Sequence, residues 1–237
     1  MSGVAGERGW PVSGTEAGPG REPEVRIELR PIGTPLSLGF TGLAIATSTL
    51  ACLNLGWLPT TSTSHVGLVL LGFAAPLQAL ATWLSFAARD TPTGSGFGVQ
   101  AASWTVAGLT LLDSPAGSRS ATLGIVLLAA AAGLVPSILT AGIGKLVPAA
   151  VMATTAIRFV LTGLYEKLGG AGLERAAGGV GIFLAVLALY TALAVDLEAA
   201  RGRTVLPLGR RSASPGPAAP APDIGEVERE PGVRPTL

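Results

Sequence analysis

Six apolar stretches of about twenty residues each dominate the chain, and short polar segments separate them. At 1.5 Å per helical residue, a stretch of this length crosses the roughly 30 Å hydrocarbon core of a bilayer. The stretches are apolar on all sides, whereas a surface helix of a soluble domain carries a polar face. The pattern therefore predicts an all-α polytopic membrane protein with six transmembrane helices, at 36–57, 66–88, 96–112, 121–140, 146–165 and 178–196.

Composition agrees with this interpretation and divides the chain into three segments. Hydrophobic residues make up 49% of the sequence and charged residues only 13%, and the charges gather near the two ends. We expect a polar tail at 1–34, one six-helix transmembrane domain at 35–209, and a disordered tail rich in Pro and Ala at 210–237. The net charge of +1 argues against a nucleic-acid partner.

The distribution of Lys and Arg predicts the orientation in the membrane. With six spans, both tails lie on one side, together with the hinges near Arg89 and Lys145. That side holds twelve of the sixteen basic residues, the other side holds three, and Arg158 falls inside the fifth span. Basic residues near the spans favour the cytoplasmic side. We therefore expect a multi-pass protein of the cell membrane with both termini in the cytoplasm.

Polar side chains inside the spans are the best functional candidates, because hydrocarbon is a poor environment for them. Asn54, Gln78 and Gln100 either form structural hydrogen bonds between helices or line a pathway. Arg158 lies near mid-span and has two interpretations. It faces the bundle interior, where it would attract an anion, or it extends along its helix toward 165–166 at the membrane surface.

The sequence holds no set of residues that suggests catalysis. The segment GSGFG at 94–98 lacks the Gly-Lys-Ser/Thr that completes a phosphate-binding loop. An intramembrane enzyme is therefore disfavoured, and we expect no catalytic residue, metal or cofactor. We assign Gly178, Gly179 and Gly181 to close helix packing rather than to contact with a substrate.

Several short motifs resemble the acetate uptake transporter family, also called the acetate/succinate permease family, of bacteria and yeast. TVLPLG at 204–209 is similar to the family's C-terminal signature, and the Asn-x-Gly-aromatic end of its first span is kept at 54–57. Gln78 and Trp104 match the family's glutamine in the second span and its tryptophan in the third, with the spacing preserved. The resemblance covers about residues 32–209.

The central motifs depart from that family. Its glutamate and tyrosine between Gln78 and Trp104 are replaced here by Ser85 and Gln100. The resemblance places the family's narrow point at that tyrosine and at a phenylalanine of the first span, which corresponds to Thr41 or its neighbour Phe40. A Thr or a Gln at this neck would make it wider or wetter than in relatives.

The resemblance implies a six-helix protomer with its own pathway, assembled as a homohexamer in the bilayer. It also implies passage of small monocarboxylate anions such as acetate, with succinate and proton coupling as further options. The alternative is a non-transporting oligomeric scaffold or sensor that keeps the same fold, which the loss of central motif residues favours. For transport, the candidate pathway residues are Phe40, Thr41, Asn54, Gln78, Gln100, Trp104 and Arg158.

Overall fold

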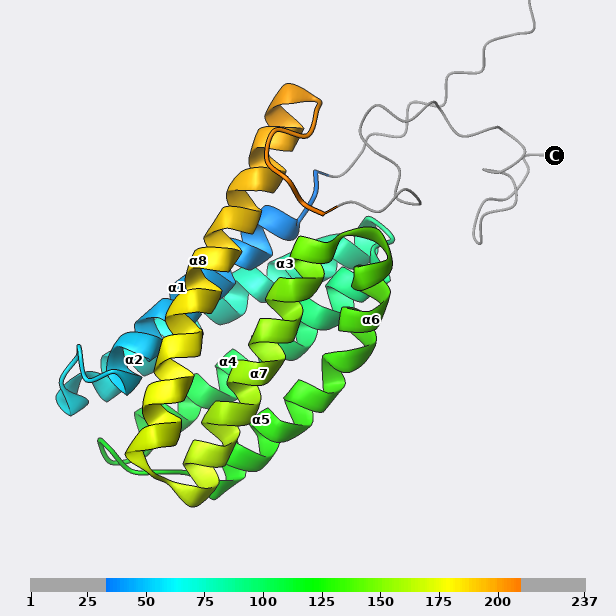
Figure 1. Ribbon diagram of the computed structural model, residues 1–237. Coiled ribbons are helices and arrows are strands. Elements are labelled where there is room, and N and C mark those ends of the chain that lie inside the picture. Colours follow the sequence, from blue (N-terminus) through cyan, green and yellow to red (C-terminus); the bar gives the residue numbers. More distant parts are fainter. Residues whose placement is uncertain (1–32, 210–237) are drawn as a thin grey trace, which may run out of the picture. The chain divides into compact units, whose positions relative to one another are not determined.

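The computed structural model describes residues 33–209, and the two predicted tails lie almost entirely outside this range. Every regular element of the described residues is a helix, and no strand is found there (Figure 1). The elements are α1 (Leu36–Asn54), η1 (Thr60–Ser62), α2 (Thr63–Val69), η2 (Leu70–Ala74), α3 (Ala75–Ala87), α4 (Thr91–Asp113), α5 (Ala121–Gly133), α6 (Val135–Gly144), α7 (Leu146–Leu168) and α8 (Ala171–Arg201).

These elements form six helical rods, because α2, η2 and α3 continue one another, as do α5 and α6. The prediction of an all-α bundle is confirmed. Five of the rods are long and apolar enough to cross a membrane, and α4 is the rod that does not meet this criterion. Its polar residues face the protein instead, since Thr93, Gln100 and Ser103 are buried. Helix α4 packs against α2, α3, η2, α5 and α6, which explains how a more polar helix is accommodated.

Helix ends differ from the predicted boundaries where polar residues continue a helix. Helix α4 begins at Thr91 because the Asp90 carboxylate accepts a hydrogen bond from the Thr93 amide at 3.2 Å and caps the first turn. Helix α8 continues to Arg201 and ends at Gly202, whose φ of +62° is a left-handed conformation that glycine adopts easily. Hydropathy locates the apolar segment of a helix, and capping residues set its ends.

The second and fourth rods are each interrupted just before a proline. In the second rod, the π-helical turn η2 ends two residues before Pro76. In the fourth, α5 and α6 separate at Leu134, two residues before Pro136. Proline has no N–H for the helical ladder, and its ring crowds the preceding turn, so the regular helix is broken there.

Two pairs of glycines bring neighbouring helices into backbone contact. A Cβ atom on Gly67 of α2 would lie 2.8 Å from the carbonyl oxygen of Gly108 on α4. In the same way, a Cβ on Gly124 of α5 would lie 2.7 Å from the carbonyl oxygen of Gly163 on α7. Helices in membranes associate through such close packing, because lipid provides little hydrophobic drive between them.

The segment that carries the TVLPLG motif folds back beside α8 and joins it to α7. Tyr190 of α8 donates its hydroxyl proton to the Pro207 carbonyl at 2.9 Å. The amides of Leu146 and Val147 donate to the carbonyls of Gly209 and Leu208 at 3.1 and 3.2 Å. These bonds supply partners for amides at the start of α7, which its own helix cannot satisfy. We call residues 204–209 the C-terminal strap.

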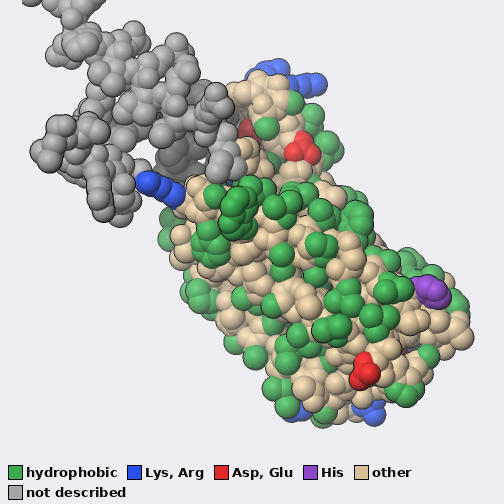
Figure 2. Space-filling model, turned by 180° about the vertical axis from the view of Figure 1, so that it is seen from behind, with side chains coloured by type: hydrophobic (Ala, Val, Ile, Leu, Met, Phe, Trp, Pro, Cys, Tyr) green, Lys and Arg blue, Asp and Glu red, His purple; other side chains and the backbone are tan. Residues whose placement is uncertain are grey.

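The outer surface of the bundle is largely apolar. Figure 2 shows hydrophobic side chains over the body of one face, with charged side chains near its ends. Large side chains point outward on several helices, among them Trp83, Leu139 and Phe183. Apolar exposure on this scale is unusual for a soluble monomer and suits contact with hydrocarbon or with other protein chains.

Replacing Gly163 by Ala should destabilise the fold. The new methyl group would lie 2.8 Å from the Gly124 carbonyl oxygen, so two backbones must separate, at a cost of about 1–3 kcal/mol. The matched control is Gly179→Ala, because nothing lies within 4 Å of that position on α8. Thermal unfolding of the purified protein in detergent should show a lower midpoint for Gly163→Ala only. Equal midpoints would contradict close packing at this pair.

Candidate functional site

Two hollows enter the bundle from opposite ends. The distal end holds the connections at 55–62, 114–120 and 169–170, and the proximal end holds Gly33 and Gly209. A hollow of about 180 Å³ lies at the proximal end and is lined by Leu36, Thr93 and Lys145 among others. A second hollow of about 80 Å³, which we call the distal cavity, lies among α1, α4, α5 and α7. Its lining includes Asn54, Trp104, Arg158, Phe159, Thr162, Tyr165, Glu166 and Glu174.

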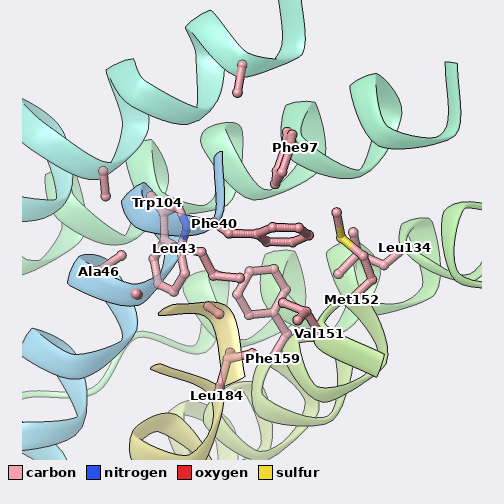
Figure 3. Packing of buried hydrophobic residues seen from close by; sticks show 14 of the residues in the cluster. Phe40, Leu43, Ala46, Phe97, Trp104, Leu134, Val151, Met152, Phe159 and Leu184 are labelled. Carbon is pink, nitrogen blue, oxygen red and sulfur yellow. The ribbon is translucent and has the colours of Figure 1, made fainter. Parts of the chain in front are cut away.

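Buried aromatic rings from three helices fill the centre of the bundle. Phe40 of α1 packs edge-to-face on Phe97 of α4, with ring centroids 5.3 Å apart. Trp104 of α4 makes a similar contact with Phe159 of α7, at 5.5 Å. Figure 3 shows these side chains converging from their helices toward one another. All four are buried, and we call this group of rings, with the glutamine pair beside it, the closed layer.

Two glutamines form a hydrogen-bonded pair at the level of Phe40. The Gln78 amide nitrogen donates to Gln100 Oε1 at 2.8 Å and lies 3.3 Å from the Gly39 carbonyl oxygen. The Gln100 amide nitrogen in turn lies 2.9 Å from the Met152 sulfur. Both glutamines are fully buried. They join α3, α4 and α7, which gives them the structural role that the sequence left open, while their pathway role stays a prediction.

Arg158 faces the interior of the bundle. Only 1% of its surface is exposed, and its Nη1 donates to the Thr47 carbonyl on α1 at 2.8 Å and also contacts the Thr47 hydroxyl. Among residues 33–209, no carboxylate forms an ion pair with it. The guanidinium therefore turns toward α1 and α8 rather than along α7 toward 165–166.

Glycine on α8 makes room for this guanidinium. A Cβ atom on Gly181 would overlap the Arg158 side chain and lie 2.9 Å from Ala51 Cβ. One turn earlier, a Cβ on Gly178 would meet Asn54, the last residue of α1, and Leu55, which follows it. Packing roles are thus observed for two of the three glycines expected to have them, while nothing lies near Gly179.

Four residues that line the distal cavity each carry a buried polar atom without a hydrogen-bond partner in the described structure. These atoms are Asn54 Oδ1, Trp104 Nε1, Arg158 Nη2 and Thr162 Oγ1. Buried polar atoms are normally paired, since an unpaired one loses its hydration without compensation. All four atoms belong to residues around one cavity, which makes it the candidate site for a polar ligand.

The candidate pathway residues are therefore found in two groups. Asn54, Trp104 and Arg158 line the distal cavity, while Phe40, Gln78 and Gln100 lie in the closed layer. Thr41 is half-buried and lines neither hollow, so Phe40 is the first-span residue at the centre.

Sequence reasoning did not identify Phe97 and Phe159 as members of the closed layer, or Thr162 as part of the lining of the distal cavity. An apolar side chain in an apolar helix gives no sign of which way it faces, so neither phenylalanine could be distinguished from a lipid-facing residue. For Thr162, the spacing of one helical turn from Arg158 was the available signal.

The fold is an α-helical bundle with five rods long and apolar enough to cross a membrane, and a layer of buried aromatic side chains lies between its two hollows. The structure is similar to that of the bacterial acetate channel SatP, with a TM-score of 0.66 and 22% sequence identity. The match covers 75% of this chain and 99% of that chain. No family model matches the sequence, and no curated protein matches it. The likeness establishes a shared fold, which is the fold that the sequence resemblance implied.

The Gln78–Gln100 bond should appear as an energetic coupling. Gln78→Leu and Gln100→Leu each leave a buried amide without its partner, so each should lower the free energy of unfolding by about 1–3 kcal/mol. The double variant should lose less than the sum, with a coupling of about 1 kcal/mol. Denaturant titration in detergent micelles measures all three. Strictly additive losses would show that the two amides do not interact.

Proposed function

We propose that this protein is a membrane channel or transporter for small monocarboxylate anions such as acetate. The observation that carries the proposal is the Arg158 guanidinium, which lies at a cavity in the bundle interior with Nη2 unpartnered and no paired carboxylate among the described residues. The fold shared with an acetate channel supports it independently. In this proposal the protein resides in the cell membrane.

The arrangement meets the physical requirements for moving a small anion through a membrane. An anion that leaves water needs hydrogen-bond donors and a positive field, and Arg158 and Trp104 offer both at the distal cavity. The aromatic layer of Phe40 and Phe97 then limits size and prevents leakage. Passage requires these rings to move apart, because they fill the path between the hollows.

Charge at the mouth of the cavity favours monoanions. Glu166 and Glu174 both line the distal cavity, and their carboxylates repel a second negative charge on a ligand. We therefore rank acetate-sized monocarboxylates above succinate. No acidic side chain is buried between residues 33 and 209, which supports passage of the ion itself over a proton relay through buried carboxylates.

The proposal includes a topology and an assembly. All six rods cross the membrane, with α4 shielded by its neighbours, and both termini are cytoplasmic, as the distribution of basic residues predicts. The proximal hollow then faces the cytoplasm. The outward apolar side chains also suit a homo-oligomer, for which the sequence resemblance implies a hexamer.

Purified protein in liposomes should take up labelled acetate, and Gln100→Leu should reduce the uptake several-fold. The leucine removes the acceptor for Gln78 and alters the closed layer. The control is Thr154→Val, because the Thr154 hydroxyl bonds only to the Ala150 carbonyl of its own helix. Absence of acetate, propionate and succinate uptake above empty liposomes would overturn transport and favour the scaffold alternative.

Arg158→Gln should weaken acetate uptake at least tenfold while the oligomer is retained. The substitution keeps a hydrogen-bond donor and removes the positive charge. Arg175→Gln is the matched control, since Arg175 lies near the start of α8 and does not line the cavity. Uptake is measured in liposomes and assembly by size-exclusion chromatography with light scattering. Loss of assembly in Arg158→Gln would instead assign this residue a structural role.

A further inference from the structure

The connection between α4 and α5, residues 114–120, crosses the distal end of the bundle. Figure 1 shows it as the green segment at the lower end, where α7 and α8 meet. Gly117 and Ser118 of this connection line the distal cavity, together with Thr60 of the connection at 55–62. A Cβ atom on Gly117 would lie 4.0 Å from Thr60 Cγ2, so the two connections are in contact. Both therefore contribute to the wall of the cavity.

The connection meets α7 at the outer end of that cavity. Arg158, Thr162 and Glu166 line the cavity and follow one another along α7 at intervals of about one helical turn. The amide of Ser120 donates to Glu166 Oε2 at 2.7 Å. This bond lies two turns from the level of Arg158, roughly 12 Å along the helix. The connection thus covers the distal side of the cavity, above the buried guanidinium.

Glu166 supplies a hydrogen-bond partner that the sequence of α5 lacks. Ser120 is the N-cap of α5, and its hydroxyl accepts from the Leu123 amide at 3.2 Å. In a capping box, a Glu or Gln at this third helical position bonds in return to the N-cap amide. Leucine cannot do so, and Glu166 of α7 takes its place. Close packing at Gly124 positions it, since a Cβ there would lie 3.2 Å from Glu166 Cβ.

Few other interactions hold the connection in place. Its sequence, SPAGSRS, contains no large apolar side chain, and residues 115–119 are exposed. The amides of Ser114 and Ser118 bond to carbonyls of α4 and of the connection itself. Among the described residues, Glu166 is its one hydrogen-bond partner in a helix other than α4 and α5. A segment with so few buried apolar contacts opens at low free energy.

A second contact with α7 is steric. The exposed Arg119 lies over the link between α7 and α8, where a Cβ atom on Gly169 would overlap its guanidinium. Glycine at this position leaves the space that the arginine occupies, but it offers no side chain to bond with it. The charged hydrogen bond of Glu166 is therefore the stronger attachment.

We propose that residues 114–120 are a lid on the distal cavity, and that the bond between Ser120 and Glu166 is the latch that holds the lid closed. When this bond breaks, the lid moves away from Thr60 and opens the cavity toward the distal end. Control of anion entry by the lid rests on the proposed function, whereas opening and closing of the lid do not require transport.

The reactivity of a thiol inside the cavity measures whether the lid is open. The chain has one cysteine, so Cys52→Ser gives a background without thiols. Thr162→Cys then introduces one thiol at a cavity residue that is only 6% exposed. Ala116→Cys in the same background introduces one on the exposed lid, away from the cavity lining. Alkylation by iodoacetamide, a small neutral reagent, is followed by mass spectrometry on the purified full-length protein in detergent.

The thiol at position 162 should react at least a hundredfold more slowly than the thiol at position 116. Adding Glu166→Ala should raise the rate at position 162 at least tenfold, because the latch is lost while the Cβ that packs on Gly124 is kept. Glu166→Gln retains an uncharged acceptor and should give a smaller increase. It also serves as the second variant if Glu166→Ala does not fold.

The matched control is Glu174→Ala. Glu174 is the other carboxylate that lines the cavity, and in the described structure it forms no hydrogen bond with residues 114–120. Its removal should leave the rate at position 162 within twofold of the parent. Equal increases in Glu166→Ala and Glu174→Ala would overturn the latch. Equal rates at positions 162 and 116 before any change at Glu166 would overturn the lid, because the cavity would already be open.

Parallel uptake assays in liposomes separate this inference from the proposed function. Acetate uptake by the wild-type protein, combined with no effect of Glu166→Ala on alkylation, would leave transport standing and overturn the lid. Alkylation that depends on Glu166, without uptake of any monocarboxylate, would support the lid and overturn transport.

Discussion

A charged side chain in an apolar interior is the constraint on which the rest of this structure depends. Moving a guanidinium out of water is costly unless the protein supplies partners for it. Thr47 supplies them on one side of Arg158, and Thr47 also donates its hydroxyl to the Gly181 carbonyl at 3.4 Å. Helices α1, α7 and α8 are therefore tied together around one positive charge. A side chain at Gly181 would fill the space that this arrangement needs, so the glycine and the arginine are structurally interdependent.

The second organising feature is the separation of the distal cavity from the closed layer. The charged and amphipathic groups line the distal cavity, whereas the layer beyond it consists of aromatic rings and a hydrogen-bonded amide pair. Trp104 and Phe159 belong to both, since they line the distal cavity and also pack on each other in the layer. Gln100, which stands where the resembled family has a tyrosine, lies in the layer and does not line the distal cavity.

Sequence alone predicted the helical rods, since length and hydropathy are properties of local segments. The selection of Arg158 and Asn54 as candidates also rested on a local property, because a polar group in a span must find a partner somewhere, whereas Trp104 was selected through the family resemblance. Which partner it finds depends on rotation and register between helices. The structure was therefore needed to show that Arg158 turns toward Thr47. It was also needed to choose between Phe40 and Thr41 and to place Phe97 and Phe159 in the closed layer. The capping role of Asp90 could be predicted from its position two residues before Pro92. Hydropathy does not detect a helix that continues through charged residues, so it missed the ends of α8.

The C-terminal strap has a mechanical consequence for the helix that carries Arg158. At the distal end, α7 is joined to α8 by the short covalent link at Gly169 and Gly170. At the proximal end, the strap bonds to the first amides of α7 and, through Tyr190, to α8. Helix α7 is therefore attached to its neighbours at three levels, by the link to α8 at its distal end, by Arg158 to α1 near its middle, and by the strap at its proximal end.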